Sequence, residues 1–161
     1  MKKTLVLIAA VAVVASPVMA QNAGQIASVR AGHDCRGCNL FQADLSGFEK
    51  RGLNLTGARL RQSDMSLAVM NRTRFANADL RDVEAYGGVF SSSNFSGANL
   101  SNASFVGAYL EGASFAGATL TGANFSGAQL NRATGLTQRQ LNQACGDEAT
   151  SLPGGLRIPA C

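Results

Sequence analysis

The sequence lacks most of the features on which enzymes and nucleic-acid-binding proteins depend. Its 161 residues include a single histidine, His33, and only 15% are charged. No block of lysine and arginine interleaves with aromatic residues, which disfavours binding to nucleic acid. There is no excess of acidic residues either, because 14 basic residues stand against 10 acidic ones. After one apolar run near the start, no second run is long enough to suggest a membrane span.

The first twenty residues have the order of an export signal. Lys2 and Lys3 form a positive region, residues 5–15 form an apolar region, and Val18 and Ala20 are small residues at the positions that a signal peptidase reads. We expect cleavage after Ala20, which leaves 12 basic and 10 acidic residues. The apolar region is short for a membrane span, and no cysteine begins the expected mature chain. The sequence therefore predicts a periplasmic or secreted protein without a stable membrane anchor.

A five-residue repeat fills most of the remaining chain. At the nineteen positions from 40 to 130 that are spaced by five, seventeen residues are Leu, Phe or Met, and the exceptions are Lys50 and Ala85. An α-helix would rotate each large residue by about 140° from the last, so no apolar stripe would form. An odd period in a flat strand would send successive large residues to opposite faces. The remaining solution is a chain that turns a corner in every repeat.

The repeat also indicates the size of a coil. Phe and Leu alternate at the large positions from Phe95 onward, which favours an even number of repeats per coil. Two sides cannot enclose these side chains, whereas four can. Gly recurs two positions after the large residue, as at Gly97 and Gly107, where a corner would need its permissive backbone. We expect an all-β solenoid whose coils stack about 4.8 Å apart and complete one another's core.

The segments ANLSN, ASFVG, ASFAG, ATLTG and ANFSG carry a family resemblance. They resemble the repeats of the pentapeptide-repeat family, and the resemblance covers about residues 38 to 134. It implies a right-handed quadrilateral β-helix with four repeats per coil. It implies little about activity, because members of this family share a fold more than a function.

Two places depart from the repeat. Lys50 occupies an inward position in the first coil, and we expect its side chain to pass the open end of the solenoid while Phe48 and Leu53 fill the space. In residues 85–88, Ala replaces the large residue and Gly replaces the small one. This second departure predicts either a bulge or small void, or a surface notch that presents Tyr86.

The candidate chemistry is sparse. Cys35 and Cys38 form a CxxC motif, but the strand and helix that surround a redox motif are missing. With His33 they could hold zinc, although an exported chain with four cysteines favours disulfides. A Ser-His-Asp triad would need His33 in a deep pocket, which a filled solenoid does not offer. We expect no enzymatic activity, no cofactor and no metal.

The tail after Ala133 loses the repeat, so the last coil needs a lid. Thr137 can begin a short helix with Gln140 as its capping-box partner, and Gly146 is placed to end that helix. The segment resembles a cap found after the repeats in other exported bacterial members of the family.

Two further cysteines, Cys145 and Cys161, bracket this tail. They lie roughly 20 Å of stacked strands away from Cys35 and Cys38, whereas a disulfide needs Cα atoms within about 7 Å. We predict disulfides between Cys145 and Cys161 and between Cys35 and Cys38. The expected organisation is a signal peptide at 1–20, an N-terminal arm or cap at 21–34, a solenoid at 35–134 and a C-terminal cap at 135–161.

The outward charges gather in the N-terminal half of the repeats. Arg59, Arg61, Arg74 and Arg81, with Tyr86, form a candidate surface for docking a partner protein. Our interpretation is a structural or interaction module of the bacterial cell envelope that presents flat walls to an unknown protein partner. The alternative, implied by the family resemblance, is a mimic of duplex DNA that binds a topoisomerase. The export signal and the lack of an acidic surface disfavour that alternative.

Overall fold

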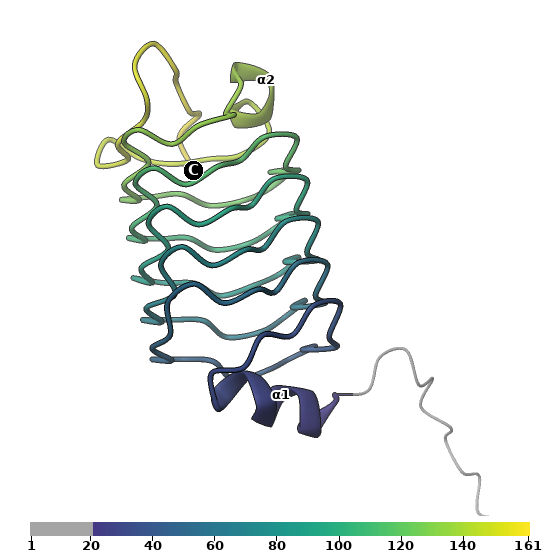
Figure 1. Ribbon diagram of the computed structural model, residues 1–161. Helices are drawn as coiled ribbons and strands as arrows, with labels where there is room; N and C mark the ends of the chain where they lie inside the picture. The colour runs from purple at the N-terminus through teal and green to yellow at the C-terminus, as the bar shows by residue number, and fades with distance from the viewer. Residues whose placement is uncertain (1–20) are drawn as a thin grey trace, which may run out of the picture.

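The computed structural model describes residues 21–161. The expected export signal at residues 1–20 lies outside the described residues. Helix α1 (Ala23–Arg30) and helix α2 (Gln138–Leu141) lie at opposite ends of a stack of four-sided coils (Figure 1). Within residues 21–161, no helix is long and apolar enough to cross a membrane.

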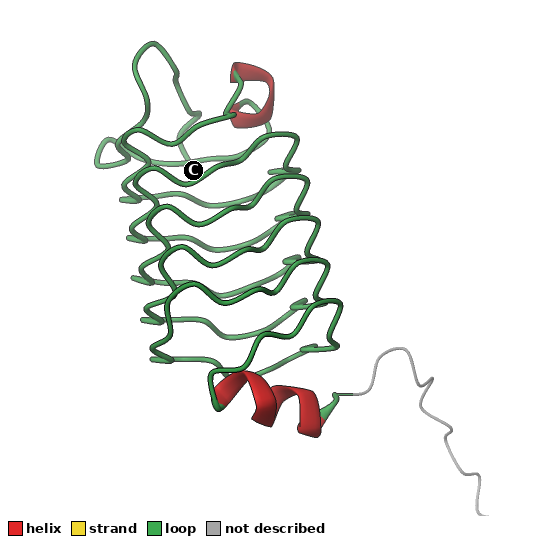
Figure 2. Ribbon diagram, in the orientation of Figure 1, coloured by secondary structure: helices red, strands yellow, loops and turns green. Residues whose placement is uncertain are grey.

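The coils contain 20 residues each, because parallel β-bridges join residues that are 20 positions apart, such as Asn39 and Arg59. The chain turns after every five residues, so each side of a coil pairs through a single residue. For this reason the coils of the described chain are drawn without extended strands in Figure 2.

The bridges define four flat walls that run along the solenoid. In chain order, wall A carries Asn39, Arg59, Asp79, Asn99 and Thr119; wall B carries Asp44, Asp64, Glu84, Ser104, Asn124 and Cys145; wall C carries Glu49, Val69, Val89, Tyr109, Gln129 and Ser151; and wall D carries Asn54, Arg74, Asn94, Ser114 and Thr134. A typical rung joins Leu60 N–H to Asp79 O at 2.8 Å and Asp79 N–H to Ala58 O at 2.9 Å. Each coil therefore depends on its two neighbours for its backbone hydrogen bonds.

The interior follows the register of the five-residue repeat. Cys35 and Cys38, which extend the inward pattern at its start, are buried. Ring stacks run along two walls: Phe95 lies 5.0 Å from Phe75 and 5.2 Å from Phe115 on one, and Phe105 lies 5.6 Å from Phe125 on the other. Rings on neighbouring walls meet edge to face, so aromatic packing fills the later coils.

The departure at residues 85–88 is filled from within the core. A Cβ added to Gly88 would lie 2.5 Å from Cε2 of Phe90, so the Phe90 ring occupies the space that an alanine would need. Ala85 is fully buried and Phe90 packs edge to face against Phe105, which lies on the same wall as Ala85. Small residues at 85 and 88 thus compensate for a large one at 90.

Lys50 takes the course expected at the open end of the first coil. Its side chain is exposed and passes beside Gly32, where an added Cβ would lie 3.4 Å from its Cδ and Cε. Leu53 is buried and Phe48 packs partly buried against the core. The charged amine therefore leaves the interior, whose space is taken by its apolar neighbours.

Helix α1 lies across the first coil, a helix that the sequence analysis did not predict within the expected arm. Asn22 caps it by accepting a hydrogen bond from Gln25 N–H, and Val29 is fully buried against the core. The Gln25 side chain accepts a hydrogen bond from Asn39 N–H at 2.6 Å, and Arg30 donates to Asp44 O at 2.9 Å. Side chains of the helix and its flanks thus bind backbone groups at the edge of the first coil.

Helix α2 has the predicted capping box, in which Thr137 and Gln140 bind each other's backbone. The prediction that Gly146 ends this helix is wrong, because the helix ends at Leu141 with Asn142 as its C-cap. Gly146 instead forms a parallel bridge with Ala160. A Cβ at Gly146 would lie 2.7 Å from Thr150 Oγ1 and 2.9 Å from Ile158 Cγ2, so close packing explains the glycine.

The tail continues two of the four walls. Cys145 bridges to Asn124 on wall B, and Ser151 bridges to Gln129 on wall C. Over the rest of the last coil, Gln140 Nε2 donates to the carbonyl oxygens of Phe115 and Ala118, each at 2.9 Å.

Candidate functional site

The structure divides the predicted docking residues among three places. Arg59 lies on wall A, and Arg61 and Arg81 lie on successive coils at the corner between walls A and B. Arg74 lies on wall D, and Tyr86 lies at the corner between walls B and C. Only the first three arginines are therefore brought together.

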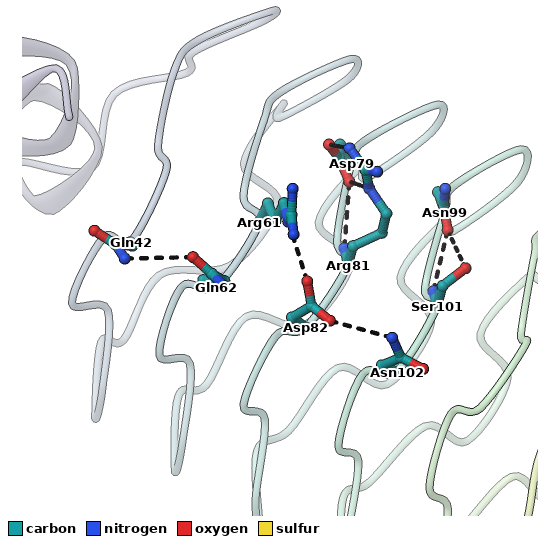
Figure 3. Close-up of polar contacts among 9 residues, drawn as sticks. All are labelled: Gln42, Arg61, Gln62, Asp79, Arg81, Asp82, Asn99, Ser101 and Asn102. Atoms are coloured by element: carbon teal, nitrogen blue, oxygen red, sulfur yellow. Dashed lines mark hydrogen bonds and ion pairs between the residues drawn. The ribbon is translucent and has the colours of Figure 1, made fainter. Parts of the chain in front are cut away.

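The arginines of wall A are neutralised by their neighbours. Arg61 Nε donates to Asp82 Oδ2 at 3.0 Å, and Arg81 binds both carboxylate oxygens of Asp79 at 2.7 Å (Figure 3). Asn102 Nδ2 donates to the other oxygen of Asp82 at 3.3 Å. The same column continues downward in Figure 3, where Gln42 donates to Gln62 at 3.3 Å.

These contacts change the acidity of both carboxyl groups. The pKa of Asp79 is lowered, chiefly because Arg81 donates hydrogen bonds to its charged form. The pKa of Asp82 is lowered by the hydrogen bond from Arg61 and then by that from Asn102. Wall A therefore presents paired charges, which leaves little net field for a charged partner.

Wall B has a different electrostatic character. Asp44, Asp64 and Glu84 occupy three successive rungs. Asp44 is 3.7 Å from Arg30, and its pKa is lowered mainly by hydrogen bonds from the Ser46 hydroxyl and backbone. Within residues 21–161, neither Asp64 nor Glu84 forms an ion pair. Two carboxylates on adjacent rungs thus lack a balancing cation.

Sequence reasoning missed the outward apolar residues of wall C. Val69, Val89 and Tyr109 follow one another on this wall, and Leu67 lies at the corner that leads into it. The signal was present in the sequence, since these positions are outward in the repeat and are polar or glycine in most other repeats.

The cysteines form two pairs at disulfide distance. Cys35 and Cys38 have Cα atoms 5.5 Å apart, and Cys145 and Cys161 have Cα atoms 4.8 Å apart. With its sulfur bonded to its neighbour, neither Cys35 nor Cys38 offers a thiolate that could bind zinc with His33.

The surface hollows of the described chain lie mainly at the C-terminal end. One of about 470 Å³ lies between Ser126 and the tail residues Asp147 and Cys161. Another, of about 390 Å³, lies between Leu120, Arg139 and the neighbouring tail. Their linings include neither histidine nor a free thiol, so they hold no nucleophile and base in contact.

Four-sided coils of pentapeptides with a filled interior define a β-helical repeat protein. The sequence profile of pentapeptide repeats matches eight copies in this chain, at residues 51–84 and 98–134. The chain belongs to the pentapeptide-repeat family, whose fold is a right-handed β-helix. No curated protein matches it.

Several solved structures are similar to this chain. A pentapeptide-repeat protein from the thylakoid lumen of Arabidopsis thaliana is 32% identical, with 65% of this chain and 72% of that chain covered and a TM-score of 0.35. QnrB1, a plasmid-mediated fluoroquinolone resistance protein, is 23% identical, with coverages of 77% and 76% and a TM-score of 0.48. Rfr23, a pentapeptide-repeat protein from the cyanobacterium Cyanothece 51142, is 21% identical, with coverages of 80% and 97% and a TM-score of 0.41.

Proposed function

We propose that this chain is a non-enzymatic interaction module of the bacterial cell envelope, which presents the walls of its solenoid to a partner protein. The observation that carries the proposal is the contrast between inside and outside. The inward positions of the repeats are buried and apolar almost throughout, while the outward side chains occupy fixed places on four flat walls. Such a molecule offers surfaces for recognition rather than a pocket for chemistry.

The cellular location is the second part of the proposal. Two cysteine pairs at disulfide distance suit an oxidising compartment, and the first twenty residues have the order of an export signal. In this proposal residues 1–20 are removed and the protein acts in the periplasm or outside the cell, without a membrane anchor and without binding nucleic acid.

The ends of the solenoid complete the proposed organisation. Residues 21–34, with α1, would close the first coil, and residues 135–161, with α2, would close the last one. Buried Val29 and Leu141 support these roles, because each covers apolar surface that an open coil would expose.

Cell fractionation and in-cell crosslinking test the proposal. The protein recovered from the periplasm or medium should begin at Gln21, as N-terminal sequencing would show. A photoreactive residue placed in turn on each wall should crosslink to a protein partner from at least one of them. A cytoplasmic protein that keeps Met1 would contradict the location, and no crosslink from any wall would contradict the interaction role.

A further inference from the structure

The exposed apolar side chains gather in one place on the described chain. The large hydrophobic residues that are exposed are Leu67, Tyr86 and Tyr109, at 62%, 57% and 45%. Leu67 N–H donates to Tyr86 O at 2.8 Å, and Tyr109 N–H donates to Gly88 O at 2.8 Å, so they occupy three successive coils. With partly buried neighbours they form a patch that we call the apolar corner: Leu67, Val69, Tyr86, Val89, Val106 and Tyr109.

Leu67 is an exception in its own column. Its φ is 57°, a left-handed conformation that disfavours residues with a Cβ. The equivalent corners of the coils before and after it are occupied by glycine, at 47, 87, 107 and 127. The Leu67 side chain lies over Gly87, where an added Cβ would be 3.0 Å from Leu67 Cδ2. A large apolar side chain is thus kept on the surface where the backbone favours glycine.

The charges beside the apolar corner are unbalanced on one side. Asp64 and Glu84 of wall B stand on adjacent rungs, where like charges repel each other, and no ion pair neutralises them within residues 21–161. Wall A differs, because Asp79 and Asp82 are bound by arginines. A cation placed beside Asp64 and Glu84 would relieve their repulsion.

The opposite edge of wall C carries positive charge. Arg51 and Arg72 lie at the corner between walls C and D. The surface therefore changes from acidic through apolar to basic across wall C. This order fixes the side on which the positive charge of a partner would lie.

We propose that the apolar corner, together with Asp64 and Glu84, is a docking site for a cationic, apolar segment of a partner protein. Apolar side chains of that segment would cover Leu67, Tyr86 and Tyr109, and lysine or arginine would meet the two carboxylates. A second copy of this chain is the poorer occupant, because six side chains over three coils cannot supply the roughly 800 Å² per partner of a stable interface. The proposal rests on the proposed interaction function and specifies its site.

Titration of the isotope-labelled protein with a short synthetic peptide of alternating leucine and lysine tests the chemistry of the site. Amide shifts should be confined to the apolar corner and wall B. Peptides with glutamate in place of lysine, or serine in place of leucine, should bind at least about tenfold more weakly. Binding that is equal for the three peptides, or shifts on another wall, would overturn the proposal.

Variants of the protein provide the matched comparison. Asp64→Asn with Glu84→Gln, and separately Leu67→Ser with Tyr86→Ser, should each weaken peptide binding about tenfold. Asp79→Asn with Arg81→Gln changes a paired carboxylate on wall A and should leave binding unchanged. All of these positions are on the surface, so unchanged circular dichroism and melting would show that the fold is retained. Equal loss in the wall A control would overturn the site.

Two further outcomes separate this proposal from the general one. Concentration-dependent shifts at the apolar corner without peptide would identify a second copy as the occupant and would overturn the proposal. A photoreactive residue at Tyr86 should crosslink in the cell, whereas one at Asn94 on wall D should not. Crosslinks from Asn94 alone would overturn the docking site and keep the interaction function, and no crosslinks from any wall would overturn both.

Discussion

The N-terminal and C-terminal halves of the solenoid share one backbone but differ in their corners and their interior. In the first half, residues with a Cβ adopt positive φ at many corners: Gln42, Gln62, Leu67, Arg72, Asn77, Asp82 and Ser92. In the second half only Asn102 and Arg132 do so, and the other positive-φ corners are glycine. The interior changes in parallel, from leucine and methionine to stacked phenylalanine.

The comparison separates two uses of the same repeat. A left-handed conformation costs a residue with a Cβ roughly 1–2 kcal/mol relative to the ordinary conformation, and less for Asn and Asp. The first half accepts that cost and thereby holds Leu67, Arg72 and Asp82 at fixed places on the surface. The second half has fewer such corners and a continuous aromatic core. We infer that recognition belongs to the first half and stability to the second.

The largest expected effect is in the aromatic core. Phe95→Ala should lower the free energy of unfolding by about 3–5 kcal/mol, because it leaves a cavity between Phe75 and Phe115. Leu55→Ala, on the same wall in the first half, should cost less because the cavity is smaller. Urea denaturation measures both.

The neighbouring outward residue is the control for this register. Asn94→Ala should cost about 1 kcal/mol or less, because it loses a hydrogen bond from Ser96 N–H at a position that is not fully buried. If Asn94→Ala costs as much as Phe95→Ala, then the assignment of inward and outward positions is wrong.

The two ends should respond differently to loss of their cysteine pairs. Replacing Cys145 and Cys161 by serine opens a loop with a sequence separation of 16 and should cost about 3 kcal/mol in the chain-entropy model. Replacing Cys35 and Cys38 opens a separation of only 3 and should cost less. Thermal melts and hydrogen exchange over residues 135–161 measure the difference, and a larger cost at the N-terminal pair would contradict it.

The compensated packing around Phe90 gives a smaller effect. Gly88→Ala should destabilise the fold by about 1–3 kcal/mol, because the added methyl group overlaps the Phe90 ring. Phe90→Leu in the same chain should recover part of the loss by vacating that space. Denaturant melts of the single and double variants decide the matter, and additive losses would show that the two sites do not share a space.

The smallest effects test the corners directly. Leu67→Gly should stabilise the fold by about 1 kcal/mol, since it removes a Cβ from a left-handed corner. Gly107→Ala should destabilise it by about the same amount, because a Cβ there meets nothing within 4 Å and only the backbone is strained. Opposite shifts of the urea midpoint are expected. A destabilised Leu67→Gly variant would show that the leucine contacts outweigh the corner strain.

The five-residue pattern was sufficient to predict the interior, because a corner in every repeat leaves one way to turn all large residues inward. The capping box of Thr137 and Gln140 was also predictable, since it depends on two residues three positions apart. The end of α2 was not, because Gly146 is fixed by contacts with Thr150 and Ile158 that only the folded tail creates. Helix α1 was signalled by Asn22 and Gln25 but lay outside the repeat.

The candidate site was less accessible to sequence reasoning than the fold. The arginines were visible, but Arg61 meets Asp82 at a separation of 21 residues, so its neutralisation depends on the length of the coil. The filling of residues 85–88 was also hidden, because Phe90 on wall C reaches into space that belongs to wall B. Both results depend on which walls are neighbours, which the five-residue period alone does not state.

The difference between the repeat of five and the coil of 20 residues restricts how such a chain can change its length. Deleting one pentapeptide keeps every later large residue inward, but it moves each later side chain to the preceding wall. Deleting a full coil of 20 residues keeps both burial and wall, since the bridges join positions 20 apart. Insertions of five upstream of Asp64 would therefore rotate the proposed docking site away from α1's Arg30 side of the molecule, whereas insertions of 20 would only lengthen the stack. The molecule thus has one unit of length that preserves folding and a longer one that preserves the orientation of its surface.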